Sequence, residues 1–131
     1  GGTNLHPQDS ATRPEQNLFT MKGPQIFKMA FQKVYDMIEK DLLSNKITHK
    51  DIDLLIPHQA SIRAIRAYSK YGGFTEKQVM NILPTTGNCV AASLPMALVI
   101  AIKNNRINRG DIIYLVGTGA GLSVGSTLLR Y

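Results

Sequence analysis

Two polar residues stand at points where apolar segments of the chain end. In "DLLIPHQASI" (residues 53–62) an aliphatic run stops at Pro57, and His58 follows just before a helical pattern begins. Ligands of open parallel sheets collect beyond the carboxyl ends of the strands, so we expect His58 at such a position. A histidine there can act as a general acid or base, although a lone one is more often a structural hydrogen-bonding residue.

A second junction of this kind carries Asn88. In "TTGN" Gly87 permits a tight turn, Asn88 follows it, and the most apolar helix of the chain comes next. We expect this turn to face the same edge as His58, and the alternative is a turn asparagine that serves its own backbone. Cys89 would complete a Cys-His-Asn set, but its place before an apolar helix favours a buried structural thiol.

The glycine-rich segment "GTGAG" (residues 117–121) follows the next predicted strand. Its backbone N–H groups could stabilise a developing oxyanion. It is a poor nucleotide-binding loop, because Leu122 stands at the sixth position where the dinucleotide pattern needs glycine or alanine. A strand follows it, whereas that pattern needs a helix.

Composition indicates one globular domain with a basic surface. The chain has 131 residues, of which 44% are hydrophobic, and its net charge of +6 favours an acidic partner. The single cysteine cannot form an internal disulfide, and no leader pattern is seen at the start, so we expect a cytoplasmic protein. The uncharged run 89–102 is too short to span a membrane, and we expect no membrane association.

Hydrophobic spacing predicts three main helices. Residues 1–22 show no period and read as a loop or arm, and an amphipathic helix then runs from Gly23-Pro24 to near Asn45. A second helix is expected over residues 60–71, with Ile62, Ile65, Tyr68 and Tyr71 toward the core. The third, over residues 91–102, is apolar almost all round and should be covered on every side.

Three strands complete the predicted fold. Residues 52–56 form a buried strand that Pro57 is expected to end, and residues 111–117 and 122–131 should form an antiparallel hairpin. Alternating helices and strands predict an α/β fold, with a mixed, mostly parallel sheet, covering helices and a C-terminal antiparallel hairpin.

Four segments together resemble a known family: "MKGPQIFKMA", "DLLIPHQASIRAI", "TTGNCVAASLPMAL" and "RGDIIYLVGTGAGLSVGSTLLRY", with the specific motifs "PHQA" and "GN-x-x-AAS" at this spacing. They look like the C-terminal half of 3-oxoacyl-acyl-carrier-protein synthase III, a thiolase-like condensing enzyme. The resemblance implies that residues 23–131 form the C-terminal domain and that the half with the nucleophilic cysteine is absent.

The same resemblance implies roles for particular residues. His58 and Asn88 would be catalytic, and the backbone amide of Ala120 would help to form an oxyanion hole. Alanine replaces the usual glycine at that position, so a positive φ there would be strained. Further matches are predicted to bind substrate (Gly23, Phe27, Ala60 and Ser61) or to dock an acidic acyl carrier protein (Lys28, Arg63 and Lys70).

The implied activity is decarboxylative condensation of an acyl thioester with malonyl-acyl-carrier protein, in fatty acid or related biosynthesis. Acyl-CoA and the carrier protein would be the partners, the complete enzyme a homodimer, and this chain alone inactive, with no cofactor beyond the thioester substrates and no metal. Two alternatives stay open. One is a same-family acyltransferase to a non-malonyl acceptor, and the other is a basic binding module without catalysis. Few aromatic residues lie near the stripe of Arg63, Arg66 and Lys70, which disfavours nucleic acid.

Overall fold

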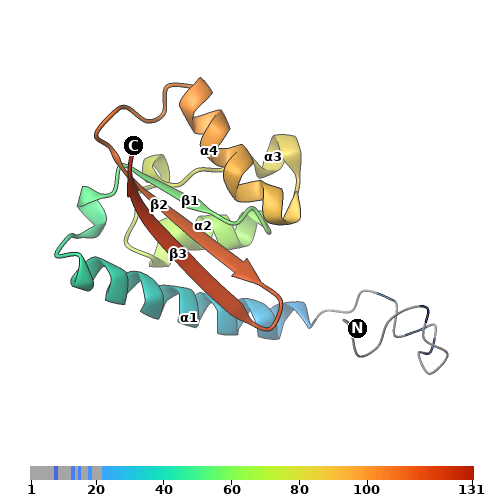
Figure 1. Cartoon of the computed structure of the whole chain (residues 1–131). Helices are drawn as coiled ribbons and strands as arrows, with labels where there is room; N and C mark the ends of the chain where they lie inside the picture. Colours follow the sequence, from blue (N-terminus) through green and yellow to red (C-terminus); the bar gives the residue numbers. More distant parts are fainter. Residues whose placement is uncertain (1–7, 9–12, 14, 16–17, 19–21) are drawn as a thin grey trace.

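The computed structural model describes residues 8, 13, 15, 18 and 22–131, so most of the predicted arm over residues 1–22 lies outside the described residues. The described elements follow one another along the chain as drawn in Figure 1. They are α1 (Gly23–Ser44), η3 (His49–Asp51), β1 (Leu54–Pro57), α2 (Ile62–Tyr71), η4 (Glu76–Gln78), α3 (Leu83–Thr86), η5 (Val90–Ala92), α4 (Ser93–Lys103), β2 (Ile112–Gly119) and β3 (Ser123–Arg130).

The three described strands form a single sheet in the order β1-β2-β3. β1 pairs in parallel with β2, with Ile56 opposite Leu115, and β2 pairs with β3 as an antiparallel hairpin. The α/β class, the parallel pair and the C-terminal hairpin are therefore confirmed. β2 runs on through Gly119, so only residues 120–122 are left to form the turn.

Helices cover both faces of this sheet (Figure 1). On one face Leu55, Tyr114 and Val116 pack with residues of α1 and α2. On the other face Leu54, Ile56 and Ile113 pack with Ala97 and Ala101 of α4. Because alternate residues of a strand point to opposite faces, β1 is buried on both sides, and all four of its residues are buried.

Two residues of α2 that were expected in the core are exposed. Ile62 is 38% exposed and Tyr71 is 60% exposed, whereas Ile65 is buried. A step of three residues falls about 60° short of a full turn of an α-helix, so four positions spaced by three spread over about 180°. The middle of such a series can face the core, but its two ends lie on the flanks.

The expectation that α4 is covered on every side is also wrong. Val99 is 49% exposed, and with Pro95, Met96 and Ile100 it lines an open groove of about 370 Å³. Only the side of α4 that packs on β1 and β2 is covered within the described part of the chain. Over those same residues, no helix combines the length and the apolar character needed to cross a membrane.

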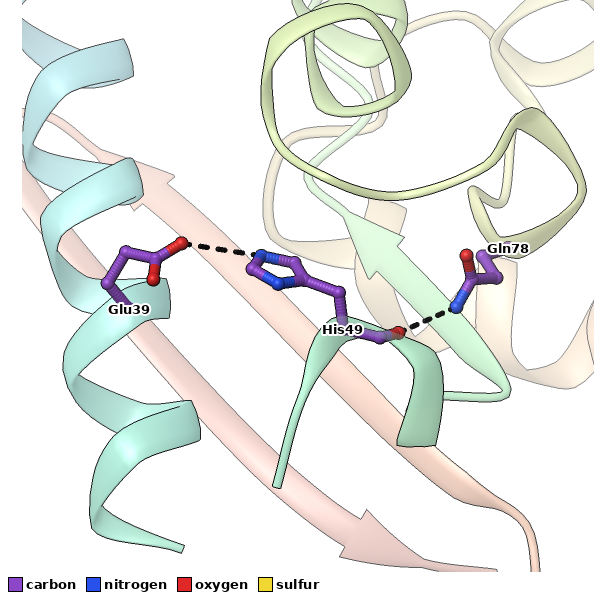
Figure 2. Close-up of polar contacts among 3 residues, drawn as sticks. All are labelled: Glu39, His49 and Gln78. Atoms are coloured by element: carbon purple, nitrogen blue, oxygen red, sulfur yellow. Dashed lines mark hydrogen bonds and ion pairs between the residues drawn. The ribbon is translucent and has the colours of Figure 1, made fainter. Parts of the chain in front are cut away.

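The N-terminal end of β1 is tied to its surroundings by His49 and Gln78 (Figure 2). The Gln78 side-chain amide donates to the carbonyl oxygens of His49 (2.8 Å) and Ile52 (2.6 Å). His49 Nε2 lies 3.4 Å from Glu39 Oε1 on α1, and its ring packs edge-on against Phe74. These contacts fix the entry to β1, at the end of the strand opposite to His58.

Candidate active site

His58 begins the loop that leaves β1, and its backbone is still held by the sheet. Pro57 pairs with Val116, and the N–H of His58 donates to the Val116 carbonyl at 2.7 Å. Pro57 is the last residue of β1 and the last with a partner in β2, so the prediction that it ends the ladder is confirmed. The side chain is half-buried, and this burial lowers the pKa of His58 below its ordinary value.

Gln59 connects this loop with the segment that leads to Asn88. Its side chain is fully buried; Nε2 donates to the carbonyl of Pro57 at 2.7 Å and to that of Met80 at 3.2 Å. Its Oε1 accepts from the N–H of Ile82 at 2.9 Å, just before α3. In the sequence, Gln59 stands out only as part of the "PHQA" motif. An amide between an apolar strand and a helix could have indicated this role, because such a residue needs backbone partners when it is buried.

Asn88 lies in a turn whose polar groups bond mostly to one another. Asn88 Oδ1 accepts from the N–H of Val90 at 2.9 Å. The N–H of Cys89 donates to Ser93 Oγ (3.1 Å), and its thiol donates to the Thr86 carbonyl (3.3 Å). The alternative interpretation, in which Asn88 bonds to the backbone of its own turn, is thus correct for its amide oxygen. Cys89 is half-buried, whereas its place in the sequence favours a buried thiol.

The hydrogen bond to Val90 leaves the other half of the Asn88 amide available. With its oxygen held by Val90, the NH₂ group points away from that contact, and it has no hydrogen-bond partner among residues 22–131. Val90 adopts a φ of 51°, which is rare for a β-branched residue, and its side chain is 74% exposed. Strained residues cluster at functional sites, so this turn is a candidate on a second ground.

Three junctions lie at one end of the molecule (right in Figure 1): the C-terminal end of β1, the segment from α3 to α4, and the β2–β3 turn. Gln59 links the first two. Leu94 at the start of α4 lies close to Gly117 in the second half of β2, where its Cδ1 would be 3.4 Å from an added Cβ. Within the described residues no hydrogen bond joins His58 directly to Asn88, so their convergence on a ligand stays a prediction.

Ala120 occupies the exposed turn between β2 and β3. Gly121 has a φ of 136°, whereas Ala120 is not among the residues with positive φ. Ala120 therefore does not adopt the positive φ that would strain an alanine. The left-handed conformation is taken by the glycine that follows, where it is tolerated.

The four predicted substrate-binding residues lie in two groups. Ser61 is the N-cap of α2, and its Oγ accepts from the N–H of Ala64 at 3.2 Å. Ala60, beside it, is exposed. Gly23 and Phe27 belong to the first turns of α1. No hydrogen bond or ring contact joins the two groups within the described part of the chain.

The predicted docking residues Lys28, Arg63 and Lys70 are all exposed. Lys28 is on α1, and the other two stand seven residues apart on one side of α2. None of the three forms an ion pair with another described residue. As for metals, the described residues contain no group of three His, Cys, Asp or Glu side chains placed to hold an ion.

Comparison with known proteins gives one consistent result. Residues 42–131 match the family model described as the C terminal of 3-oxoacyl-[acyl-carrier-protein (ACP)] synthase III. A beta-ketoacyl-[acyl-carrier-protein] synthase III of Wolbachia pipientis from Culex pipiens is 42% identical over 122 residues, which cover 93% of this chain and 38% of that protein. The protein of the same name from Alkalilimnicola ehrlichii is 40% identical over 112 residues, which cover 86% and 35%.

Solved structures show the same likeness. The 3-oxoacyl-[acyl-carrier-protein] synthase III of Aquifex aeolicus superposes with a TM-score of 0.85 at 33% identity, over 92% of this chain and 39% of that one. The corresponding enzyme of Pseudomonas aeruginosa gives a TM-score of 0.84 at 31% identity, over 92% and 38%. The chain thus spans less than half the length of the relatives it matches.

Proposed function

The chain belongs to the 3-oxoacyl-[acyl-carrier-protein] synthase III family, whose C-terminal model matches residues 42–131, and on that premise we propose that it supplies two of the three catalytic side chains of a condensing enzyme. The third, a nucleophilic cysteine, would belong to an N-terminal half of the complete synthase. Cys89 is not assigned that role, because both its N–H and its thiol are used within its own turn.

In the proposed reaction the nucleophilic cysteine first takes an acyl group from a thioester. A malonyl unit on the carrier protein then loses CO₂: the bond to its carboxylate breaks, and the electron pair forms an enolate of the thioester. The enolate carbon bonds to the acyl carbon, and the cysteine thiolate leaves. His58 and Asn88 would donate hydrogen bonds to the enolate oxygen while its charge develops.

The observations that carry this proposal are the protonation of His58 and the orientation of the Asn88 amide. Burial lowers the pKa of His58, so its imidazole is neutral at pH 7 and keeps one N–H to donate. The Asn88 oxygen is held by Val90, so its NH₂ group is left for a ligand. Ala120 would supply a backbone N–H to a second oxyanion site, and Gly23, Phe27, Ala60 and Ser61 would line the path of the pantetheine arm.

Decarboxylation in the complete synthase tests the proposal. We expect His58→Ala and Asn88→Ala each to slow CO₂ release from the malonyl thioester by about 100- to 1,000-fold. The rate of acylation of the nucleophilic cysteine, monitored by mass spectrometry, should stay nearly unchanged. Normal CO₂ release in both variants would contradict the assigned roles. Acyl transfer to an amine or hydroxyl acceptor without CO₂ release would identify an acyltransferase instead.

A further inference from the structure

Three aromatic rings connect α1 to α2, and we call Phe27, Phe31 and Tyr71 the aromatic bridge. Phe27 and Phe31 stack with ring centroids 6.5 Å apart, and Phe31 meets the edge of Tyr71 at 6.0 Å. Tyr71 is nevertheless 60% exposed. A large aromatic residue left in water at the end of a helix is the type of side chain that dominates binding energy in protein interfaces.

The surface beside the aromatic bridge is hollow and largely apolar. An open hollow of about 680 Å³ is lined by Phe27, Lys28, Met29, Phe31 and Gln32. Met29 is 53% exposed and Ile26 is 38% exposed on the same helix. Contiguous exposed apolar surface of this kind marks a site of contact with another molecule.

Positive charge flanks the aromatic bridge on two elements. Lys28 stands in the lining of the hollow, and Lys70 Nζ lies 5.1 Å from the centre of the Tyr71 ring. Neither ammonium group forms an ion pair with another described residue. The surface is thus complementary to a protein face with a protruding aliphatic side chain between carboxylates.

We propose that the aromatic bridge is the apolar anchor of the carrier-protein docking surface. This inference rests on the proposed function, which supplies an acidic carrier as the partner. An aliphatic side chain of the carrier enters the hollow against Phe27 and Phe31, and its carboxylates pair with Lys28 and Lys70. Coenzyme A fits this place less well, because the Lys70 ammonium already covers one face of the Tyr71 ring that an adenine would need.

Binding of a phosphopantetheine-loaded bacterial acyl carrier protein to the 131-residue chain, measured by calorimetry, tests the anchor. We expect Tyr71→Ala to raise Kd about fivefold to tenfold. Tyr71→Phe keeps the ring and should change Kd by less than about twofold. Leu43→Ala is the matched control, because Leu43 is 80% exposed on the same helix α1 but far from the aromatic bridge. Amide NMR spectra confirm that each variant is folded.

The outcomes separate the anchor from the proposed function. If the unaltered chain does not bind the carrier, the assignment of the partner fails and the anchor fails with it. If the carrier binds and Arg63→Glu with Lys70→Glu weakens it, but Tyr71→Ala does not, the anchor alone is overturned. A loss of coenzyme A affinity in Tyr71→Ala as large as the loss of carrier affinity would make the bridge a nucleotide platform and would also overturn it.

Discussion

At the scale of single residues, the chemistry of the candidate site depends on partial burial. His58 keeps its backbone in the sheet while its side chain is half-buried, and removal from water lowers its pKa. A neutral imidazole and a primary amide are both hydrogen-bond donors without charge. Such donors can stabilise an oxyanion that forms during a reaction without first being neutralised by a counter-ion.

The lowered pKa of His58 predicts how stability depends on pH. The folded state binds this proton less readily than the unfolded state, whose histidine titrates near 6.5. His58 therefore costs no stability above pH 6.5, and the folded state loses stability as the pH falls from there through the folded pKa. We expect NMR titration to place the His58 midpoint below 6.5, and His58→Gln to flatten part of the acid limb of the unfolding free energy. A midpoint above 6.5 would contradict the effect of burial.

Gln59 is predicted to matter more for stability than its surface neighbours. Gln59→Ala removes three buried hydrogen bonds and leaves the N–H of Ile82 and two carbonyls without their partner. We expect a loss of about 3 kcal/mol in urea unfolding. Gln32→Ala, which removes one exposed bond to Asp36, should cost less than about 0.5 kcal/mol. Equal losses in the two variants would show that Gln59 does not hold the loop.

At the scale of elements, much of the fold could be predicted from the chain. The long helix α1 and the hairpin are confirmed, and α4 begins at Ser93, two residues after the predicted start, because spacing and proline positions fix these elements locally. Which face of each helix is buried was harder to predict. Whether Tyr71 or Val99 is covered depends on which elements lie across from it, and local spacing does not contain that information.

The candidate site was predictable in part for the same reason. The position of His58 after a strand and that of Asn88 in a turn follow from local signals. In the structure His58 directly follows β1, and Asn88 lies between α3 and η5. The hydrogen bond between Gln59 and Ile82 joins residues 23 positions apart, which local signals do not reveal. The hydrogen bond that orients the Asn88 amide comes from Val90, and no propensity predicts a valine with positive φ at that position.

The turn after α2 gives a prediction at this scale. Gly73 has a φ of 78°, and a Cβ there would lie 3.0 Å from the His49 ring. We expect Gly73→Ala to cost about 3 kcal/mol of unfolding free energy, from strain and from displacement of that ring. Gly110→Ala isolates the strain, because Gly110 has a φ of 101° in open space and should cost about 1 kcal/mol. A smaller loss for Gly73→Ala than for Gly110→Ala would show that the His49 ring moves freely.

At the scale of the whole molecule, the chain is short beside its relatives and leaves an apolar surface open to water. It spans 38% of the Wolbachia relative and 39% of the Aquifex structure. The α4 groove of Pro95, Met96, Val99 and Ile100 is apolar and open to water. These facts agree with the proposal that a synthase becomes catalytic only when another half of the protein supplies the nucleophile.

This proposal predicts the behaviour of the chain in isolation. After incubation with a panel of acyl thioesters, the 131-residue chain should show no stable mass increase, because Cys89 is half-buried and its thiol bonds to the Thr86 carbonyl. Cys89→Ser is the control for any adduct that does appear. Rapid acylation of Cys89 would contradict its structural assignment.

The proposed reaction requires that the His58 imidazole and the Asn88 amide meet at one edge of the sheet as paired donors. The most direct test is an NMR measurement of magnetisation transfer between the Asn88 side-chain NH₂ protons and the ring protons of His58, in the chain labelled with ¹⁵N and ¹³C. We expect a cross-peak between the two side chains, and its loss in Asn88→Ala. An NH₂ group that shows cross-peaks only to its own turn, and none to the imidazole, would show that the two donors do not converge.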